Sequence, residues 1–135
     1  MGDGALILLD THIALWLTLE SRQLTRRSTQ RLAEARGRGE TLAIASITLL
    51  ETARLIAHRR IEIQTSLDAY MEELSSLFTV IPITAAIAAA TTRLPASYPH
   101  DPADRIIGAT ALVHGATLIT ADQRIRRAKA AHTLW

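Results

Sequence analysis

The sequence contains no cysteine and few aromatic residues. Among its 135 residues, Phe, Trp and Tyr together account for 4%, whereas hydrophobic residues account for 48%. The absence of cysteine excludes disulfide bonds, thiolate metal ligands and cysteine nucleophiles. With so few aromatic side chains, the core must consist of Leu, Ile, Val and Ala, which suits helices packed on a sheet. The length predicts a single domain, residues 1–135.

Several sequence signals of other protein classes are also missing. There is neither a Gly-rich phosphate loop nor a Gly-x-Ser-x-Gly elbow, the signatures of P-loop hydrolases and of serine hydrolases. No apolar stretch approaches the length that spans a bilayer. The segment Met1–Ala5 lacks the positive charge that begins a signal peptide. We therefore expect a cytoplasmic protein that does not cross a membrane.

Lysine is almost absent, and arginine takes its place. The chain has 14 Arg and one Lys, Lys129, with a formal net charge of +2. The planar arginine side chain binds phosphates in a bidentate manner, so this composition permits a nucleic-acid partner. It does not require one, because genome composition produces the same bias.

Short apolar runs alternate with helical patterns along the whole chain. Residues 5–9 form a continuous apolar run typical of a buried parallel strand. Further strands are predicted at 42–45, 78–81 and 117–120, with an edge strand at 132–135. Helices are predicted at 11–19, 25–36, 46 or 48 to 58, 65–76, 84–92 and 102–114, with a short one after Asp122, and 94–102 is a proline-rich loop. This order predicts an α/β fold with a parallel sheet and helices on both faces.

Four acidic residues lie at junctions between these elements. Asp10, Glu51 and Asp122 each follow an apolar run, and Asp104 precedes another. Ligands of open parallel sheets collect at the carboxyl ends of the strands, so these acids are placed to converge there. Converging carboxylates repel one another, and a divalent cation such as Mg²⁺ relieves that repulsion. The pattern therefore indicates metal-dependent chemistry.

Helix capping is the competing explanation for the aspartates. Asp10 and Asp122 stand where an N-cap residue would accept backbone N–H groups. The segment Asp101–Asp104 has the preferred residues of a helix start, with Asp at the cap and Pro at the next position. The sequence alone leaves capping and metal binding both open.

Glu51 is harder to explain by local structure, because it interrupts the largely apolar stretch 42–57. A carboxylate there needs a partner, either a cation or an arginine such as Arg54. The nearby His12 and His100 lack the close histidine spacing of a zinc site, so we interpret them as solvated surface residues.

Four segments follow one another along the chain: Leu8–Trp16, Ser46–Glu51, His100–Ala111 and Leu118–Asp122. In this order they resemble the motifs of the PIN-domain family, and more closely those of the VapC-type toxins of bacterial toxin-antitoxin systems. The Asp-Thr-His-x-x-Leu-Trp and Asp-Pro-x-Asp-Arg patterns within them are specific, and the resemblance extends from Leu6 to Trp135.

The resemblance implies a three-layer α/β/α PIN-like fold with a central, mostly parallel sheet. It implies a metal-dependent endoribonuclease that hydrolyses RNA phosphodiester bonds. The family's acidic quartet, carried over to this sequence, would bind Mg²⁺ or Mn²⁺, with Asp101 as an auxiliary acid. The quartet consists of Asp10, Glu51, Asp104 and Asp122. Beside them, Thr11 and Thr120 are candidates for bonds to a phosphate or carboxylate oxygen, and Arg105 for contact with RNA or for a pair with a neighbouring acid.

The resemblance also implies partners and leaves alternatives. An antitoxin that presents an arginine to the acidic pocket is expected, as is a homodimer. Three positions depart from the family pattern: Leu50 replaces a common Trp, Ala103 a frequent Phe, and Ala121 a basic or polar residue. The alternatives are a PIN-like RNA- or protein-binding module without catalysis, and a receiver-like phosphoacceptor domain. The second lacks its expected lysine near a late strand, since Lys129 lies well beyond 117–120.

Overall fold

The computed structural model describes residues 5–135. Residues 1–4, on which the expected absence of a signal peptide partly rests, lie outside the described residues. Within 5–135, no helix combines the length and hydrophobicity needed to cross a membrane. The assignment of residues 1–135 to one domain stays a prediction.

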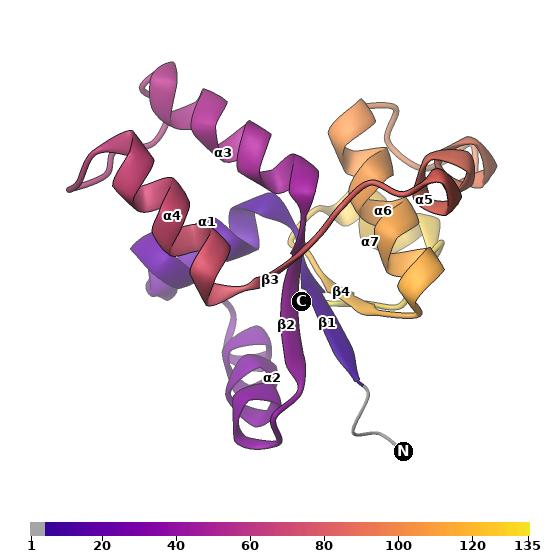
Figure 1. The fold of residues 1–135 in the computed structure, drawn as a ribbon. Helices are drawn as coiled ribbons and strands as arrows, with labels where there is room; N and C mark the ends of the chain where they lie inside the picture. Colours follow the sequence, from indigo (N-terminus) through magenta and orange to yellow (C-terminus); the bar gives the residue numbers. More distant parts are fainter. Residues whose placement is uncertain (1–4) are drawn as a thin grey trace.

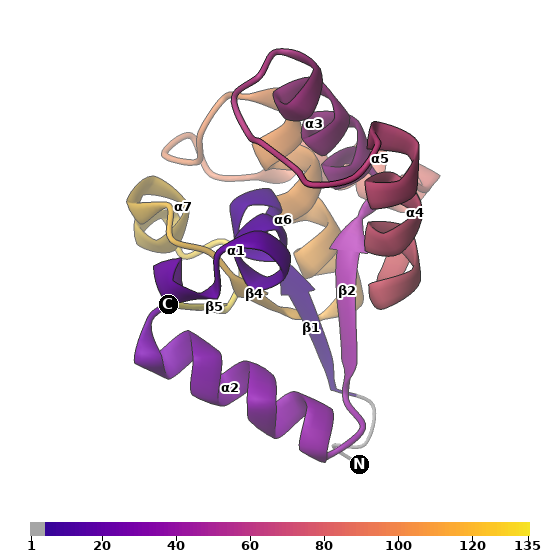
Figure 2. The same ribbon diagram turned by 90° about the vertical axis from the view of Figure 1, so that its left-hand side faces the viewer.

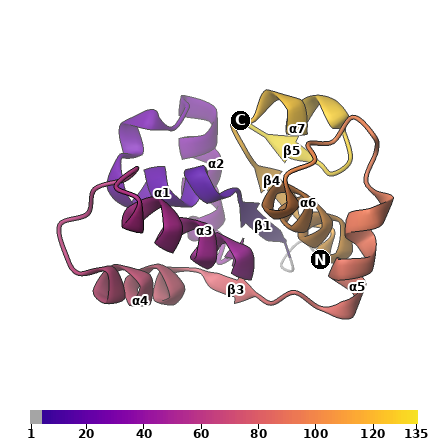
Figure 3. The same cartoon turned by 90° about the horizontal axis from the view of Figure 1, so that it is seen from above.

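The centre of the fold is one five-stranded sheet with the order β3-β2-β1-β4-β5 (Figures 1 and 3). All four strand pairings are parallel. The strands are β1 (Leu6–Leu9), β2 (Thr41–Ala45), β3 (Thr79–Ile81), β4 (Thr117–Ile119) and β5 (Thr133–Leu134). The strands predicted from apolar runs are therefore confirmed, and the edge strand predicted at 132–135 is shorter than expected.

Helices cover both faces of this sheet, which confirms the three-layer α/β/α architecture (Figures 1 and 3). The first group is α1 (Thr11–Leu19), α2 (Arg26–Gly37), α3 (Ser46–Ala57) and α4 (Leu67–Leu77). The second group is α5 (Ala85–Ala90), α6 (Pro102–His114) and α7 (Gln123–Ala128). Strand β1 divides its side chains between the two cores: Ile7 and Leu9 join the first group, and Leu8 joins the second. This alternation follows from the two-residue period of a strand.

Local capping explains most helix boundaries. Thr25, Ser66 and Thr84 accept a backbone N–H of the helix that each precedes. Gly115 ends α6 with a left-handed backbone, φ 61°, which glycine adopts without steric cost.

Some local expectations were wrong. Neither Ser46 nor Thr48 caps α3, because the helix begins at Ser46 directly after β2 and has no side-chain cap. The helix expected at 84–92 ends at Ala90 and continues as a 3₁₀ turn, Thr91–Arg93. A second 3₁₀ turn, Ser21–Gln23, was not expected at all.

The carboxyl ends of the central strands lie at the same edge of the sheet. In β1 and β4, Leu9 stands opposite Ile119, so the residues that follow, Asp10 and Thr120, are neighbours. Helix α3 begins at the end of β2 and lies above this edge, where it contacts α1, α4 and α6 (Figure 2). The edge therefore gathers residues from distant parts of the chain.

Candidate active site

Five acidic side chains line one hollow at this edge of the sheet. They are Asp10, Glu51, Asp101, Asp104 and Asp122, and the hollow, of about 480 Å³, is completed by Thr11, His12, Trp16 and Ala121. The structure thus brings together every acid that the sequence singled out. We call this space the acidic hollow.

Asp10 is fixed on both of its carboxylate oxygens. It caps α1, where Oδ1 accepts the backbone N–H of Thr11 at 2.9 Å. Oδ2 accepts a bond of 2.7 Å from the Thr120 hydroxyl. Burial raises the pKa of Asp10, as does the nearby charge of Asp122, while these bonds and the charge of His12 act in the opposite direction. The capping role and a place in the acidic hollow are therefore not alternatives.

Glu51 projects from the second turn of α3 and is held by a hydroxyl. The buried Thr11 donates from Oγ1 to Oε1 of Glu51, and the same hydroxyl lies 2.9 Å from Oγ1 of Thr48. No ion pair joins Glu51 to Arg54 in the part of the chain that the structure describes. Burial raises the pKa of Glu51, the bond from Thr11 lowers it, and the charge of Asp10 raises it. Of the two partners considered for Glu51, the arginine is therefore not found, and a network of hydroxyl groups holds the carboxylate instead.

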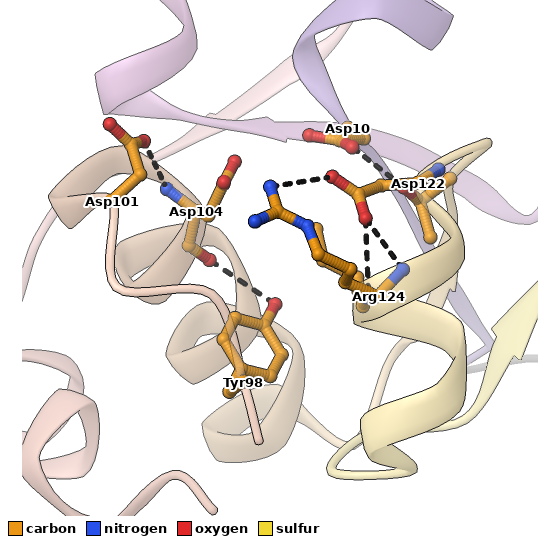
Figure 4. A network of polar contacts seen from close by, with 8 residues as sticks. Asp10, Tyr98, Asp101, Asp104, Asp122 and Arg124 are labelled. Atoms are coloured by element: carbon orange, nitrogen blue, oxygen red, sulfur yellow. Dashed lines mark hydrogen bonds and ion pairs between the residues drawn. The ribbon is translucent and has the colours of Figure 1, made fainter. Parts of the chain in front are cut away.

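Asp101 and Asp104 come from the start of α6, as Figure 4 shows. Asp101 is the N-cap, and its Oδ2 accepts the backbone N–H of Asp104 at 3.1 Å, with Pro102 in the first turn. Burial, followed by the charges of the surrounding acids, raises the pKa of Asp104 to about 7. The contributing acids, in decreasing order, are Asp10, Asp101, Glu51 and Asp122. Asp104 therefore experiences the mutual repulsion of the whole group.

Asp122 caps α7 with one oxygen and faces an arginine with the other. Oδ1 accepts the backbone N–H groups of Arg124 and Ile125 at 2.8 and 3.1 Å. Nη2 of Arg124 lies 3.9 Å from Oδ2, and Figure 4 shows this side chain reaching from α7 toward Asp122. Arg124 was not among the residues expected at the site, although its position two residues after a helix-capping aspartate was a usable signal.

The two threonines predicted to contact substrate are buried and bonded to carboxylates. Thr11 is 3% exposed and Thr120 is 0% exposed, and their hydroxyls donate to Glu51 and Asp10. These bonds orient the acids. A contact between either hydroxyl and RNA stays a prediction.

Arg105 makes its bonds outside the acidic hollow. Its guanidinium donates to three backbone carbonyl groups, and no ion pair joins it to an acid within residues 5–135. The acceptors are Thr91 at 3.3 Å, Tyr98 at 3.5 Å and Pro99 at 3.1 Å. Arg105 therefore stabilises the loop before α6, and its predicted contact with RNA stays a prediction.

The two histidines near the acids have different environments. Both are exposed, but His12 lines the acidic hollow while His100 does not. The ring of His12 packs against Trp16 with centroids 5.9 Å apart. His12 is thus more than a solvated surface residue, because it borders the site.

The donor set fits a hard divalent cation. All the ionisable groups that line the acidic hollow, except His12, are carboxylates, which Mg²⁺ and Mn²⁺ prefer, and the mutual repulsion of the carboxylates favours a cation among them. Among residues 5–135, however, no three Asp, Glu or His side chains are already grouped as a compact ligand cage. The acids share a hollow, and side-chain rotation would have to close the ligand shell.

The parallel α/β/α fold and the acidic hollow at its strand ends define a PIN domain. The PIN domain model matches residues 7–131, and the chain belongs to this family. Among its relatives is Ribonuclease VapC22 of Mycobacterium tuberculosis, which is 37% identical over 120 residues, or 89% of each chain. The resemblance to VapC-type proteins in the sequence is therefore confirmed.

Solved structures share the same fold at low sequence identity. VapBC2 from Rickettsia felis, solved bound to a DNA fragment from its promoter, has a TM-score of 0.73 and 17% identity, covering 96% of this chain and 97% of that one. A toxin-antitoxin complex from Klebsiella pneumoniae has a TM-score of 0.68 and 24% identity, covering 96% of each chain. At these identities the likeness establishes the fold alone.

Proposed function

We propose that this PIN-domain protein is a metal-dependent endoribonuclease and the toxin of a VapBC-type pair. The observation that carries the proposal is the convergence of five carboxylates, from four separate segments of the chain, on one hollow. The similarity to Ribonuclease VapC22 supports RNA as the substrate.

Asp10 and Asp104 are the primary ligands in this proposal, with Mg²⁺ or Mn²⁺ as the cation. Glu51 and Asp122 complete a second metal position or orient the other ligands, and Asp101 is an auxiliary acid. When bound, the cation lowers the pKa of a water molecule and neutralises charge that develops on the scissile phosphate. Bridging hydroxyls, such as that of Thr120, hold the carboxylates in place, as supporting bonds do at metal sites.

The acids by themselves are unsuited to bind RNA. A phosphate that approached the metal-free hollow would meet several carboxylates, and their charges already raise the pKa of Asp104. RNA should therefore bind more tightly in the presence of the cation than alone, because a cation held by these carboxylates would offset their repulsion of the phosphate.

Substitution of the primary ligands tests the proposal. Asp10→Asn and Asp104→Asn should each abolish cleavage of single-stranded RNA in Mg²⁺ or Mn²⁺ while the circular dichroism spectrum is retained. Asp68→Asn is the matched control, since Asp68 is an exposed acid on α4 and does not line the acidic hollow. Cleavage retained by either ligand variant in a clean preparation would contradict the assignment. RNA binding by the wild-type protein without cleavage in either metal would identify a binding module instead.

An antitoxin partner, a homodimer and a cytoplasmic location belong to the same proposal. The solved structures of VapBC proteins from Rickettsia felis and Salmonella typhimurium support the antitoxin. The antitoxin should copurify with this chain and suppress cleavage. Unaltered nuclease activity in the purified pair would contradict inhibition. Sedimentation velocity of the purified chain tests the dimer.

A further inference from the structure

Three hollows of the surface meet at His12. The first is the acidic hollow. The second, which we call the Arg54 hollow, is bordered by Arg54, His58 and Arg60 and extends to the acids Glu51 and Asp101. The third, the Trp16 hollow, has a volume of about 570 Å³ and lies against α1. His12 borders all three, so one side chain adjoins each of these hollows.

An aromatic cluster stands where the acidic and Trp16 hollows adjoin. The ring centroids of His12 and Trp16 are 5.9 Å apart, and Trp16 is again 5.9 Å from Trp135. These are the only two tryptophans of the sequence. Both are half-buried and pack against the core on the α1 side of the sheet. Core packing accounts for their buried atoms, but it does not explain why Trp16 also borders two hollows.

The lining of the Trp16 hollow combines apolar side chains with amide and carboxylate groups. Beside Trp16, the apolar residues include Leu15, Leu55 and Ile61. The amides are those of Gln23 and Gln64, and the carboxylates are those of Glu20 and Glu62. The volume lies within the roughly 300–1,000 Å³ typical of sites for small ligands. A flat heterocycle with hydrogen-bonding edges matches such a lining, because it stacks on aromatic rings and bonds to amide groups.

A positive charge lies beside this hollow. Arg60 borders both the Trp16 hollow and the Arg54 hollow, where Arg54 and His58 accompany it. Arginines in this position suit the phosphates of a chain whose base occupies the Trp16 hollow. Glu20 and Glu62 of the Trp16 hollow carry the opposite charge, so the choice of a nucleotide rests on the aromatic pair together with the two arginines and not on net charge.

We infer that the Trp16 hollow binds an unpaired nucleobase of the RNA, stacked on His12 and Trp16, while Arg54 and Arg60 contact the adjoining phosphates. The inference rests on the proposed function, since the acidic hollow must hold the scissile phosphate. The nucleotide next to that phosphate then passes His12 into the Trp16 hollow. A base inside a duplex is already stacked, so the site selects single-stranded or looped RNA.

Tryptophan fluorescence provides a direct test, because both tryptophans belong to the cluster. The full chain is titrated with a short single-stranded oligoribonucleotide and with an abasic oligomer of the same length, in Ca²⁺ and in EDTA, and RNA integrity is checked on a gel. Binding of labelled oligomers is followed in parallel by anisotropy. The base-containing RNA should quench the fluorescence, and the abasic oligomer should not.

His12→Ala and Trp16→Leu should weaken binding of the base-containing RNA about tenfold, as expected for the loss of one stacking contact, and should leave the abasic oligomer unaffected. Trp16→Phe should restore most of the affinity. The matched control is His114→Ala, an exposed histidine at the end of α6 that borders none of the three hollows. Because His12 is exposed, its variant keeps the test valid if Trp16→Leu fails to fold.

The outcomes separate this inference from the proposed function. One outcome is that the wild-type chain binds and cleaves RNA in Mg²⁺, but its tryptophan fluorescence is not quenched and His12→Ala has no effect on binding. This result would overturn the base site and leave the nuclease proposal intact. Equal binding of both oligomers, with quenching only when a copurified polypeptide is added, would make the hollow a protein-binding site and would also overturn it. Absence of both RNA binding and cleavage by the wild-type chain would remove the proposed function and the inference with it.

Discussion

Thr120 donates a hydrogen bond of 2.7 Å from its Oγ1 to Oδ2 of Asp10, across a sequence separation of 110 residues. The bond follows from the sheet, because the two residues come directly after the paired positions of β4 and β1. The same Oγ1 accepts the backbone N–H of Asp122 at 3.1 Å. One buried hydroxyl therefore links two of the acids that line the hollow.

Removal of this hydroxyl should impair the site without unfolding the protein. Thr120→Val keeps the shape of the side chain but leaves Oδ2 of Asp10 without its donor. We expect metal-supported cleavage, or the affinity for Mg²⁺, to fall roughly 10- to 100-fold, the usual effect of losing a supporting bond at a metal site. Mg²⁺ titration of cleavage rates measures both effects.

Thr120→Ser is the matched control, since it restores the donor and should recover most of the activity. Equal activity of the Val and Ser variants would show that the bond does not position Asp10.

The sequence predicted this edge of the sheet but not its bonds. Apolar runs and terminal acids were enough to place Asp10 and Asp122 at neighbouring strand ends, because parallel strands put their carboxyl ends on one edge. The role of Thr120 depends on the register of β1 against β4. Only folding brings Thr120 next to Asp10, because the two residues are 110 positions apart in the sequence. Local patterns carry no information about such a contact.

The stability of the metal-free protein should depend on pH through Asp104. Its pKa is about 7 in the folded chain, whereas the pKa of an aspartate in an unfolded chain is about 3.9. Between these values the folded state binds more protons than the unfolded state, so the free energy of unfolding falls as the pH rises from about 4 to about 7. Urea denaturation in EDTA at a series of pH values measures this decline.

Two comparisons isolate the contribution of Asp104. Asp104→Asn should flatten the decline in part, since the pKa values of Asp10 and Glu51 are raised as well. Saturating Mg²⁺ should also reduce it, because a cation bound to the ionised carboxylates would stabilise the folded state. A wild-type stability that does not change across this pH range in EDTA would contradict the shifted pKa.

Gly108 is required by the packing of α6 on the loop that precedes it. A Cβ atom at this position would lie 2.3 Å from Oη and 2.6 Å from Cζ of Tyr98. Tyr98 is 1% exposed, and its hydroxyl donates to the backbone carbonyl of Asp104 at 3.2 Å, so it has little room to move. Gly108→Ala should therefore destabilise the protein by about 1–3 kcal/mol, as overpacking does, and displace Asp104.

Gly37→Ala is the control for this prediction. A Cβ atom at Gly37, the last residue of α2, meets nothing within 4 Å, and its backbone needs no positive φ. We expect the free energy of unfolding of the Gly37→Ala variant to be unchanged or higher by up to about 1 kcal/mol. Thermal denaturation of both variants measures the contrast. Equal melting temperatures would show that Tyr98 moves away from the added Cβ atom at little cost in stability.

Long side chains were the least predictable part of the site. The motif Asp-Pro-x-Asp-Arg drew attention to Arg105, yet this arginine binds carbonyl groups of the preceding loop. Arg124 lies outside the four motif segments, but it faces Asp122. The long side chain of an arginine reaches groups several residues away, so its position in the sequence hardly limits which group it contacts. The short side chain of Asp10, by contrast, lies where the end of β1 places it.

Arg124 should compete with the metal ion for Asp122. Its Nη2 lies 3.9 Å from Oδ2, and its side chain is 72% exposed, so the pair is weak and easily exchanged. Arg124→Ala should therefore raise the affinity for Mg²⁺ in the absence of RNA by roughly two- to fivefold, the scale of an exposed ion pair. Isothermal titration calorimetry with Mg²⁺ measures the change. Arg127→Ala removes the same charge from an exposed position on the same helix, so it separates this local contact from a general loss of positive charge. If both variants bind Mg²⁺ equally well, the effect is general, and Arg124 does not occupy a ligand position of the metal.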